Sequence, residues 1–198
     1  MKKIILTLLL TVNLFAFNSV KYFAGVNGEG ELTIENKTAN TKEKYDQDYS
    51  FSAGAELEKT FKGNKFIALG LGAKYEKDFA VKSANYGEID FASTVPLYAM
   101  GKIIIPMDRY SRMYVKGEAG YNFVVDGEYL EKVKDDYKNS TIKVDGGLYS
   151  GFGLGFDINN FNIELLYNTT RVNLIWDKVE REYSNSKISA SLGYKFGL

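Results

Sequence analysis

Residues 66–76 read FIALGLGAKYE, and apolar side chains recur in this stretch at every second position. One face would carry Ile67, Leu69, Leu71, Ala73 and Tyr75, and the other Ala68, Gly70, Gly72, Lys74 and Glu76. Side chains of a β-strand point alternately to its two sides, so a period of two is typical of a strand with unlike faces. The stretch therefore predicts a strand that separates an apolar environment from a polar one.

The same period returns along most of the chain. It is most regular in residues 144–158 and 187–198. Five other segments follow it less regularly: 21–35, 49–60, 88–105, 112–125 and 161–174. Pro96 predicts an irregularity in its strand, because proline lacks the N–H of a ladder hydrogen bond. The pattern also slips at 169–171, which predicts a bulge or a strand leaving the membrane. The chain is therefore predicted to be all-β, with eight strands.

The connections between the predicted strands alternate in length. The joins KTFKGN, PMDRYS and DINN are short, whereas those around 36–48, 77–87, 126–141 and 175–186 are longer and polar. Barrels of the bacterial outer membrane have short periplasmic turns, long extracellular loops and an even strand number. The sequence therefore predicts an eight-stranded antiparallel up-and-down transmembrane β-barrel over residues 17–198, with both ends of the mature chain in the periplasm.

The first residues differ from the rest of the chain. Two lysines precede an apolar run at residues 4–10, which continues weakly to Ala16. A spanning helix needs about 20 apolar residues, so this run is too short to cross a membrane. A cationic start, a short apolar run and a small residue are typical of a secretory signal peptide. We predict a signal peptide at residues 1–16 that is cleaved after Ala16.

Alternation alone permits two kinds of barrel. A soluble lipocalin-like barrel fills its interior with apolar side chains, whereas an outer-membrane barrel turns them to lipid and encloses the polar ones. The signal peptide, the sorted connections and the apolar chain end favour the outer-membrane barrel. The aromatic residues near strand ends, which fit interfacial girdles, are Phe61, Tyr75, Phe123, Phe156, Phe161 and Phe196.

Charged residues on the polar face would then lie in the lumen. Eight strands enclose an interior just wide enough for side chains to fill it. Because buried charges need partners, we predict cross-barrel ion pairs that close the lumen. The members of this charge network are Glu56, Glu58, Glu76, Glu118, Asp145 and Glu164, with Lys74, Lys102, Lys116, Lys143, Lys187 and Lys195. The alternative is a narrow channel for ions or small solutes, favoured by the glycine-rich walls at Gly70, Gly72, Gly151 and Gly153.

The chain ends on SLGYKFGL, which alternates polar and apolar residues up to the last position. This stretch resembles the C-terminal assembly signal of bacterial outer-membrane barrel proteins, whose places are taken here by Ser191, Gly193, Phe196 and Leu198. Leucine stands where a terminal phenylalanine is commoner. Over residues 20–198 the architecture is similar to the small eight-stranded barrels of the OmpX-like and OmpA-barrel group, often placed in the porin family. The resemblance implies an integral outer-membrane protein that the barrel assembly machinery inserts into outer-membrane lipid.

The amino-acid composition argues against several classes of function. The chain has 25 basic and 25 acidic residues, which excludes a strongly basic nucleic-acid binder. It has no cysteine for a thiolate site. The resemblance to outer-membrane barrels implies that an enzyme of this kind would use a catalytic histidine as its general base. This chain has no histidine. A paired-carboxylate mechanism stays open, although no spacing indicates one. We expect no catalytic, cofactor or metal site.

The long connections are the extended surface that the predicted barrel presents to the outside. We therefore expect a monomer with a structural or surface-interaction role, in adhesion or envelope integrity. Its partners would be host or cell-surface ligands that contact the loops. Deleting residues 128–139 should then remove surface binding without preventing folding.

Overall fold

The computed structural model shows a closed β-barrel. It describes residues 17–36, 40–47, 49–61, 63–77, 81–83, 87–89, 93–126, 142–176 and 179–198. The predicted signal peptide at 1–16 and the loop segment 128–139 lie outside these ranges. Within the same ranges, no helix is long and apolar enough to cross a membrane.

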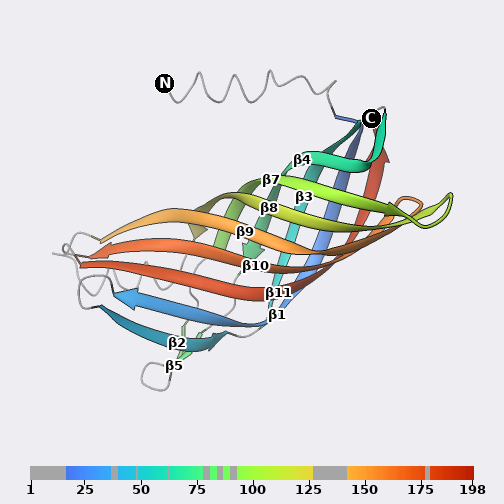
Figure 1. The fold of residues 1–198 in the computed structure, drawn as a ribbon. Coiled ribbons are helices and arrows are strands. Elements are labelled where there is room, and N and C mark those ends of the chain that lie inside the picture. The colour runs from blue at the N-terminus through green and yellow to red at the C-terminus, as the bar shows by residue number, and fades with distance from the viewer. Residues whose placement is uncertain are drawn as a thin grey trace, which may run out of the picture.

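Eight long strands form the barrel wall (Figure 1). They are β1 Ser19–Asn36, β3 Ser50–Phe61, β4 Asn64–Lys77, β7 Ser93–Pro106, β8 Ser111–Asp126, β9 Ile142–Ile158, β10 Phe161–Trp176 and β11 Val179–Gly197. Each strand pairs antiparallel with the next, and β11 pairs with β1 to close the sheet. The predicted eight-stranded antiparallel up-and-down barrel is confirmed.

Three short strands extend the sheet at one end of the barrel. They are β2 Thr41–Gln47, β5 Val81–Ser83 and β6 Gly87–Ile89. Residues 30–36 of β1 pair with β2, whereas residues 19–27 pair with β3. The prediction of a loop at 36–48 is therefore wrong over β2. Its sequence, TKEKYDQ, has no apolar face, so periodicity gives no sign of a strand there.

Two further boundaries differ from the prediction. The strand predicted at 88–105 begins only at Ser93, and its first residues belong to β6. The loop predicted at 175–186 is also wrong, because β10 and β11 stay paired as far as Trp176 and Val179. Backbone hydrogen bonds continue this hairpin through a polar sequence, where no apolar alternation is needed to hold the pairing.

We call the end with the short connections the turn end and the opposite end the loop end. The short connections are residues 62–63, 107–110 and 159–160, and Leu198 lies at the same end. Asn159 has a φ of 54°, in the left-handed region that asparagine tolerates in tight turns. At the loop end β1, β2, β10 and β11 project to the left in Figure 1.

Both predicted irregularities are confirmed. The pairing of β9 with β10 shifts register between Thr170 and Val172, where the apolar pattern slips. The pairing of β4 with β7 joins Ala73 to Leu97 and resumes three residues later, at Glu76 and Thr94, so it is interrupted at Pro96. Proline has no N–H to donate to this ladder.

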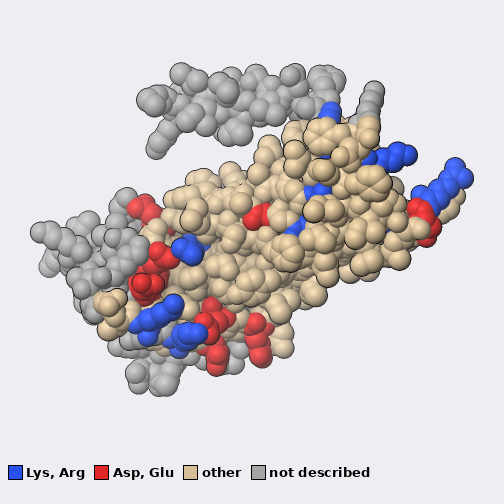
Figure 2. Space-filling model, in the orientation of Figure 1, with Lys and Arg blue, Asp and Glu red and all other residues tan. Residues whose placement is uncertain are grey.

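The barrel is apolar outside and polar inside. On the outer face Leu69, Phe152 and Ile163 are each more than half exposed, whereas Lys116 and Glu56 in the lumen are 1% exposed. Figure 2 shows a visible face that is largely uncharged along its middle, with charged side chains gathered toward the two ends. This distribution excludes the lipocalin-like alternative and is that of a barrel surrounded by lipid.

The predicted aromatic residues lie near the edges of this apolar surface. Phe61, Tyr75, Phe123, Phe161 and Phe196 are exposed on it, and Phe156 is half-buried. At the turn end the ring of Tyr194 packs against both Phe161 and Phe196, with centroid distances of 5.2 and 4.7 Å. Such rings suit the boundary between hydrocarbon and head groups.

Candidate functional site

Glycines on the inner wall make room for large side chains in the lumen. A Cβ on Gly72 would collide with the ring of Tyr98, and its distance to the Tyr98 hydroxyl oxygen would be only 2.7 Å. A Cβ on Gly155 would collide in the same way with the ring of Tyr114. The glycines therefore do not widen an open channel, because tyrosine rings fill the space beside them.

Lys116 lies at the centre of the lumen among three carboxylates. Its Nζ is 2.5 Å from Oε1 of Glu56, 2.5 Å from Oε1 of Glu118 and 2.8 Å from Oε1 of Glu164. Glu56 belongs to β3 and Glu164 to β10, so the lysine of β8 joins strands that are not neighbours. We call these four residues the central cluster.

The three carboxylates of the central cluster converge closely enough to hold a cation. One oxygen from each lies within 4.8 Å of the others. Oxygen ligands in such a group suit divalent cations. Here the Lys116 ammonium lies within hydrogen-bond distance of all three and supplies positive charge itself. The arrangement is therefore that of an internal ion-pair cluster.

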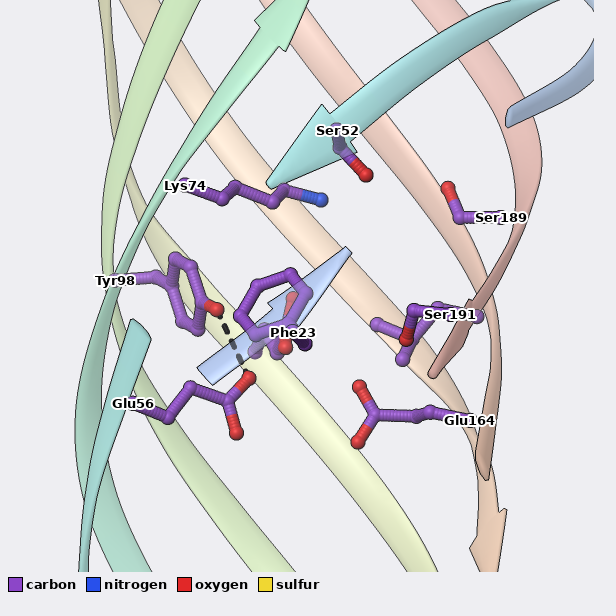
Figure 3. Close-up of a pocket in the computed structure, with 10 residues that line it drawn as sticks. Phe23, Ser52, Glu56, Lys74, Tyr98, Glu164, Ser189 and Ser191 are labelled. Atoms are coloured by element: carbon purple, nitrogen blue, oxygen red, sulfur yellow. Dashed lines mark hydrogen bonds between the residues drawn. The ribbon is translucent and has the colours of Figure 1, made fainter. Parts of the chain in front are cut away.

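A second lysine and two tyrosines extend the central cluster. Lys21 of β1 is 2.9 Å from both Glu56 Oε2 and Glu164 Oε2. Tyr98 donates a hydrogen bond of 2.9 Å to Glu56, and Tyr114 donates one of 2.6 Å to Glu164. Figure 3 shows Glu56 and Glu164 reaching into the lumen from opposite walls, with Tyr98 bonded to Glu56. The carboxylates are thus held from several strands at once.

A layer of ion pairs lies nearer the turn end. Glu58 bonds Lys102 at 2.8 Å and also bonds Lys195, which comes from β11 on the other side of β1. Arg112 donates a hydrogen bond of 2.8 Å to Asp157 on the neighbouring strand. These contacts close the floor of the lumen below the central cluster.

A layer with fewer charged residues lies nearer the loop end. Glu76 bonds Lys74 at 2.6 Å and Lys187 at 3.3 Å, and Tyr149 donates a hydrogen bond to Glu118. Beside them runs a hydrogen-bonded chain of amide and hydroxyl groups across four strands. Its members are Asn168, Ser189, Asn27 and Ser50, joined at 2.5, 2.6 and 2.8 Å.

A small cavity remains between the central cluster and the layer nearer the loop end. Its volume is about 20 Å³, which is room for about one water molecule, and Ser52, Ser189 and Ser191 are among the residues that line it. Figure 3 shows the Lys74 ammonium directed into it from the wall opposite Ser189 and Ser191. The cavity does not continue toward the turn end, because the central cluster and the ion pairs of Glu58 and Arg112 lie on that side of it.

The structure brings most of the predicted lumen charges together. Glu56, Lys116, Glu118 and Glu164 form the central cluster, Lys74 and Glu76 meet near the loop end, and Lys195 meets Glu58 near the turn end. Asp145 is half-buried four residues nearer the loop end than Tyr149, away from the central cluster. The side chain of Lys143 lies outside the described part of the structure.

Sequence reasoning missed Lys21 and Tyr114. Lys21 alternates with the outward-facing Tyr22 at the start of β1, so its position in the period was the available signal. Tyr114 likewise shares the inner parity of Lys116. An aromatic residue is compatible with either face of a barrel strand, so its type gave no further indication.

The predicted assembly-signal residues occupy both faces of β11. Phe196 and Leu198 are exposed on the apolar outside, whereas Ser191 lines the cavity. A Cβ on Gly193 would lie 3.0 Å from the carbonyl oxygen of Tyr22, a tight contact that would require the neighbouring strand to shift by a few tenths of an ångström. The chain end itself is fixed by a hydrogen bond of 2.9 Å from the Leu198 N–H to the Asn18 carbonyl.

Comparison with known proteins identifies the fold. No protein-family model and no curated protein sequence matches the chain. The solved structure of the outer membrane protein OprG from Pseudomonas aeruginosa superposes with a TM-score of 0.58 at 15% identity, over 92% of this chain and 98% of OprG.

Other barrels match over similar lengths but less closely in shape. Neisserial surface protein A has a TM-score of 0.47 at 11% identity, over 88% of this chain and 97% of its own. The outer membrane protein AlkL has a TM-score of 0.42 at 16% identity, over 92% of each chain. The likeness to OprG, together with the closed eight-stranded sheet, shows that the chain has the fold of a small outer-membrane β-barrel.

Proposed function

We propose that this protein is an integral outer-membrane barrel with a closed lumen, which acts through the surface at its loop end. The turn end would lie in the periplasm and the loop end outside the cell. The observation that carries the proposal is the central cluster, in which Lys116 joins carboxylates of β3, β8 and β10 across the lumen. We propose no enzymatic activity.

The filled lumen argues against a diffusion pore. Eight strands leave an interior just wide enough for side chains, whereas water-filled porins use about 16 to 18. Here the ion pairs of Glu56, Glu58 and Glu164 with lysines from other strands occupy that interior. Opening a path would separate buried charges, which is costly.

The loop end supplies the surface for a structural or adhesive role. β1 and β2 project there as a hairpin whose outer face is polar, with Lys44 bonded to Glu31 at 2.9 Å and Thr33 bonded to the same carboxylate. Regular backbone pairing keeps this surface ordered beyond the barrel. A polar and ordered projection suits contact with another cell, a host surface or the envelope.

Planar-bilayer recording tests whether the lumen is closed. We expect purified monomer to give no large, steady and reproducible conductance. Such a conductance would favour the narrow channel, which is the second candidate because a cavity persists above the central cluster. The variant Lys116→Met is the matched control, because loss of a plug should raise any leak current, whereas an open channel would already conduct in the unmodified protein.

A binding screen tests the role of the loop end. Purified protein in vesicles would be screened against host cells, extracellular matrix and bacterial envelopes. Deleting residues 128–139 should leave the barrel folded and abolish binding, whereas Arg109→Ser in the connection 107–110 at the turn end should leave binding unchanged. Equal binding by the deletion variant and the unmodified protein would exclude that segment from the interaction.

A further inference from the structure

Two lysines of the β3–β4 hairpin face outward at the turn end. Lys59 pairs in register with Leu69, which is 51% exposed on the lipid-facing surface, and it lies on the same face of β3 as Leu57. Lys65 of β4 is exposed two residues before Ile67, which is 42% exposed. Alternation along β3 places Lys59 on the outside of the barrel, and Lys65 is exposed near the tip of the hairpin, where the pairing of β3 with β4 shifts register.

No carboxylate neutralises these two lysines among the residues that the structure describes. Glu58, the neighbour of Lys59, points into the lumen and bonds Lys102 and Lys195. Asp157 also lies inside, and it bonds Arg112. The carboxylate of Asp108 accepts three hydrogen bonds within its own turn. Figure 2 likewise shows Lys and Arg side chains projecting at this end of the visible face.

The surroundings of the two lysines place their charges at the edge of the hydrocarbon. Exposed Phe61 lies between them in the hairpin, and exposed Phe66 follows Lys65. A lysine on the lipid face is tolerated near the interface, where its long side chain carries the ammonium to the head groups. The anion available at that depth is a lipid phosphate.

We infer that Lys59 and Lys65 form a binding site for the head-group phosphate of an anionic phospholipid. The two ammonium groups would contact the phosphate, and its acyl chains would lie along the apolar surface that begins with Leu57, Ile67 and Leu69. This inference rests on the proposed function, because it requires the barrel to lie in a membrane.

Reconstitution into vesicles tests the site. The folded protein would be unfolded with urea in phosphatidylcholine vesicles, with and without phosphatidylglycerol of the same acyl chains. We expect phosphatidylglycerol to raise the folding equilibrium constant by about five-fold for each lysine, as for basic residues near an anionic surface. The double variant Lys59→Gln/Lys65→Gln should lose this rise and behave like the unmodified protein in pure phosphatidylcholine.

The matched control is Lys42→Gln/Lys44→Gln, which removes two exposed lysines from β2 at the loop end. It should keep the full response to phosphatidylglycerol. A response that survives in the Lys59/Lys65 variant, or that falls equally in the control, would overturn the site. Failure of the unmodified barrel to insert into either kind of vesicle would instead overturn the proposed function, and the inference with it.

Inorganic phosphate distinguishes a lipid from a soluble anion. Added to phosphatidylcholine vesicles at matched ionic strength, it should not stabilise the protein, because nothing holds it at the depth of the two lysines. Stabilisation by free phosphate equal to that by phosphatidylglycerol would show that the site takes a soluble anion and would overturn the lipid assignment.

Discussion

Lys116 is the residue on which the central cluster depends. Replacing it with methionine, which is unbranched and one atom shorter, leaves Glu56, Glu118 and Glu164 without their shared ammonium group. Breaking a buried ion pair by removing one partner costs about 3–5 kcal/mol. We expect Lys116→Met to lower the free energy of unfolding by about that amount, measured by urea titration in vesicles.

An exposed ion pair provides the control for this variant. Lys44 bonds Glu31 at 2.9 Å, but both side chains are more than half exposed. Surface pairs of this kind contribute about 0–1 kcal/mol. Lys44→Met should therefore change stability little, and a similar loss in the two variants would contradict the structural role of the central cluster.

Gly72 and Gly117 make a second pair of matched positions. A Cβ at Gly72 would enter the space of the Tyr98 ring, whereas a Cβ at Gly117 would meet nothing within 4 Å. Overpacking a filled interior costs about 1–3 kcal/mol. Gly72→Ala should destabilise the barrel by about this amount and disturb the bond from Tyr98 to Glu56.

Thermal unfolding of both glycine variants measures this difference. Gly117→Ala should unfold at the temperature of the unmodified protein or slightly above it, because alanine restricts the unfolded chain more than glycine does. If Gly72→Ala were equally well tolerated, the lumen would have more free space beside Tyr98 than the structure shows.

At the scale of single elements, the β7–β8 turn is organised by Asp108. Hydrogen bonds from the Ser111 hydroxyl and from the N–H groups of Tyr110 and Ser111 hold the pKa of the Asp108 carboxyl below its usual range. A lowered pKa in the folded state means stabilisation that is complete above the unfolded-state pKa. That stabilisation is lost as the pH falls through the folded-state value.

Carbon NMR of the labelled carboxyl group measures this pKa directly. We expect Asp108 to titrate at lower pH than an unbonded aspartate, and Ser111→Ala to raise its pKa because the largest cause of the shift is removed. The pKa of Asp108 should return to the usual range of an aspartate only when all three hydrogen bonds have been removed. An unchanged pKa in Ser111→Ala would contradict the role given to this hydroxyl.

The transmembrane parts of the strands could be predicted from sequence because lipid and lumen demand opposite side chains. Residues 66–76 and 144–158 alternate in this way, and the strands predicted there match β4 and β9 over nearly their full lengths. Beyond the membrane the demand disappears, so β2 and the outer ends of β10 and β11 have no apolar alternation, although their backbones pair. The strands continue there because backbone pairing extends the hairpins, and the local sequence pattern does not indicate this extension.

The lumen charges were predictable as a set, but their partners were not. Glu56 and Lys116 both had to face inward, because neither can face lipid. That Lys116 meets Glu56 and Glu164, however, depends on the stagger of strands around the closed barrel. Stagger is a property of all eight strands together, so alternation within one strand cannot give it.

At the scale of the whole molecule, closure of the sheet between β1 and β11 can be tested by cross-linking. Ala24 and Leu192 are direct partners across this seam, and the chain has no cysteine of its own. Facing residues in an antiparallel pair have Cα atoms about 4.5–5.5 Å apart, within the range of a disulfide. We expect Ala24→Cys/Leu192→Cys to form an intramolecular disulfide in the folded protein.

Electrophoresis without reducing agent detects this cross-link. The control is Ala24→Cys/Leu148→Cys, because Leu148 also faces outward but lies on β9, which does not pair with β1. It should remain uncross-linked under the same oxidation. Equal cross-linking of both pairs would show that the thiols meet by collision between molecules or in unfolded chains, and would leave no support for a closed seam.

The central cluster also bears on how the barrel is made. Its residues come from β3, β8 and β10, and Lys21, which bonds two of its carboxylates, comes from β1, so neither half of the chain contains the complete set of partners. A partly inserted sheet would present unpaired charges to hydrocarbon, where each is costly. We therefore expect partly inserted intermediates to be unstable until the last strands pair, so that insertion is concerted.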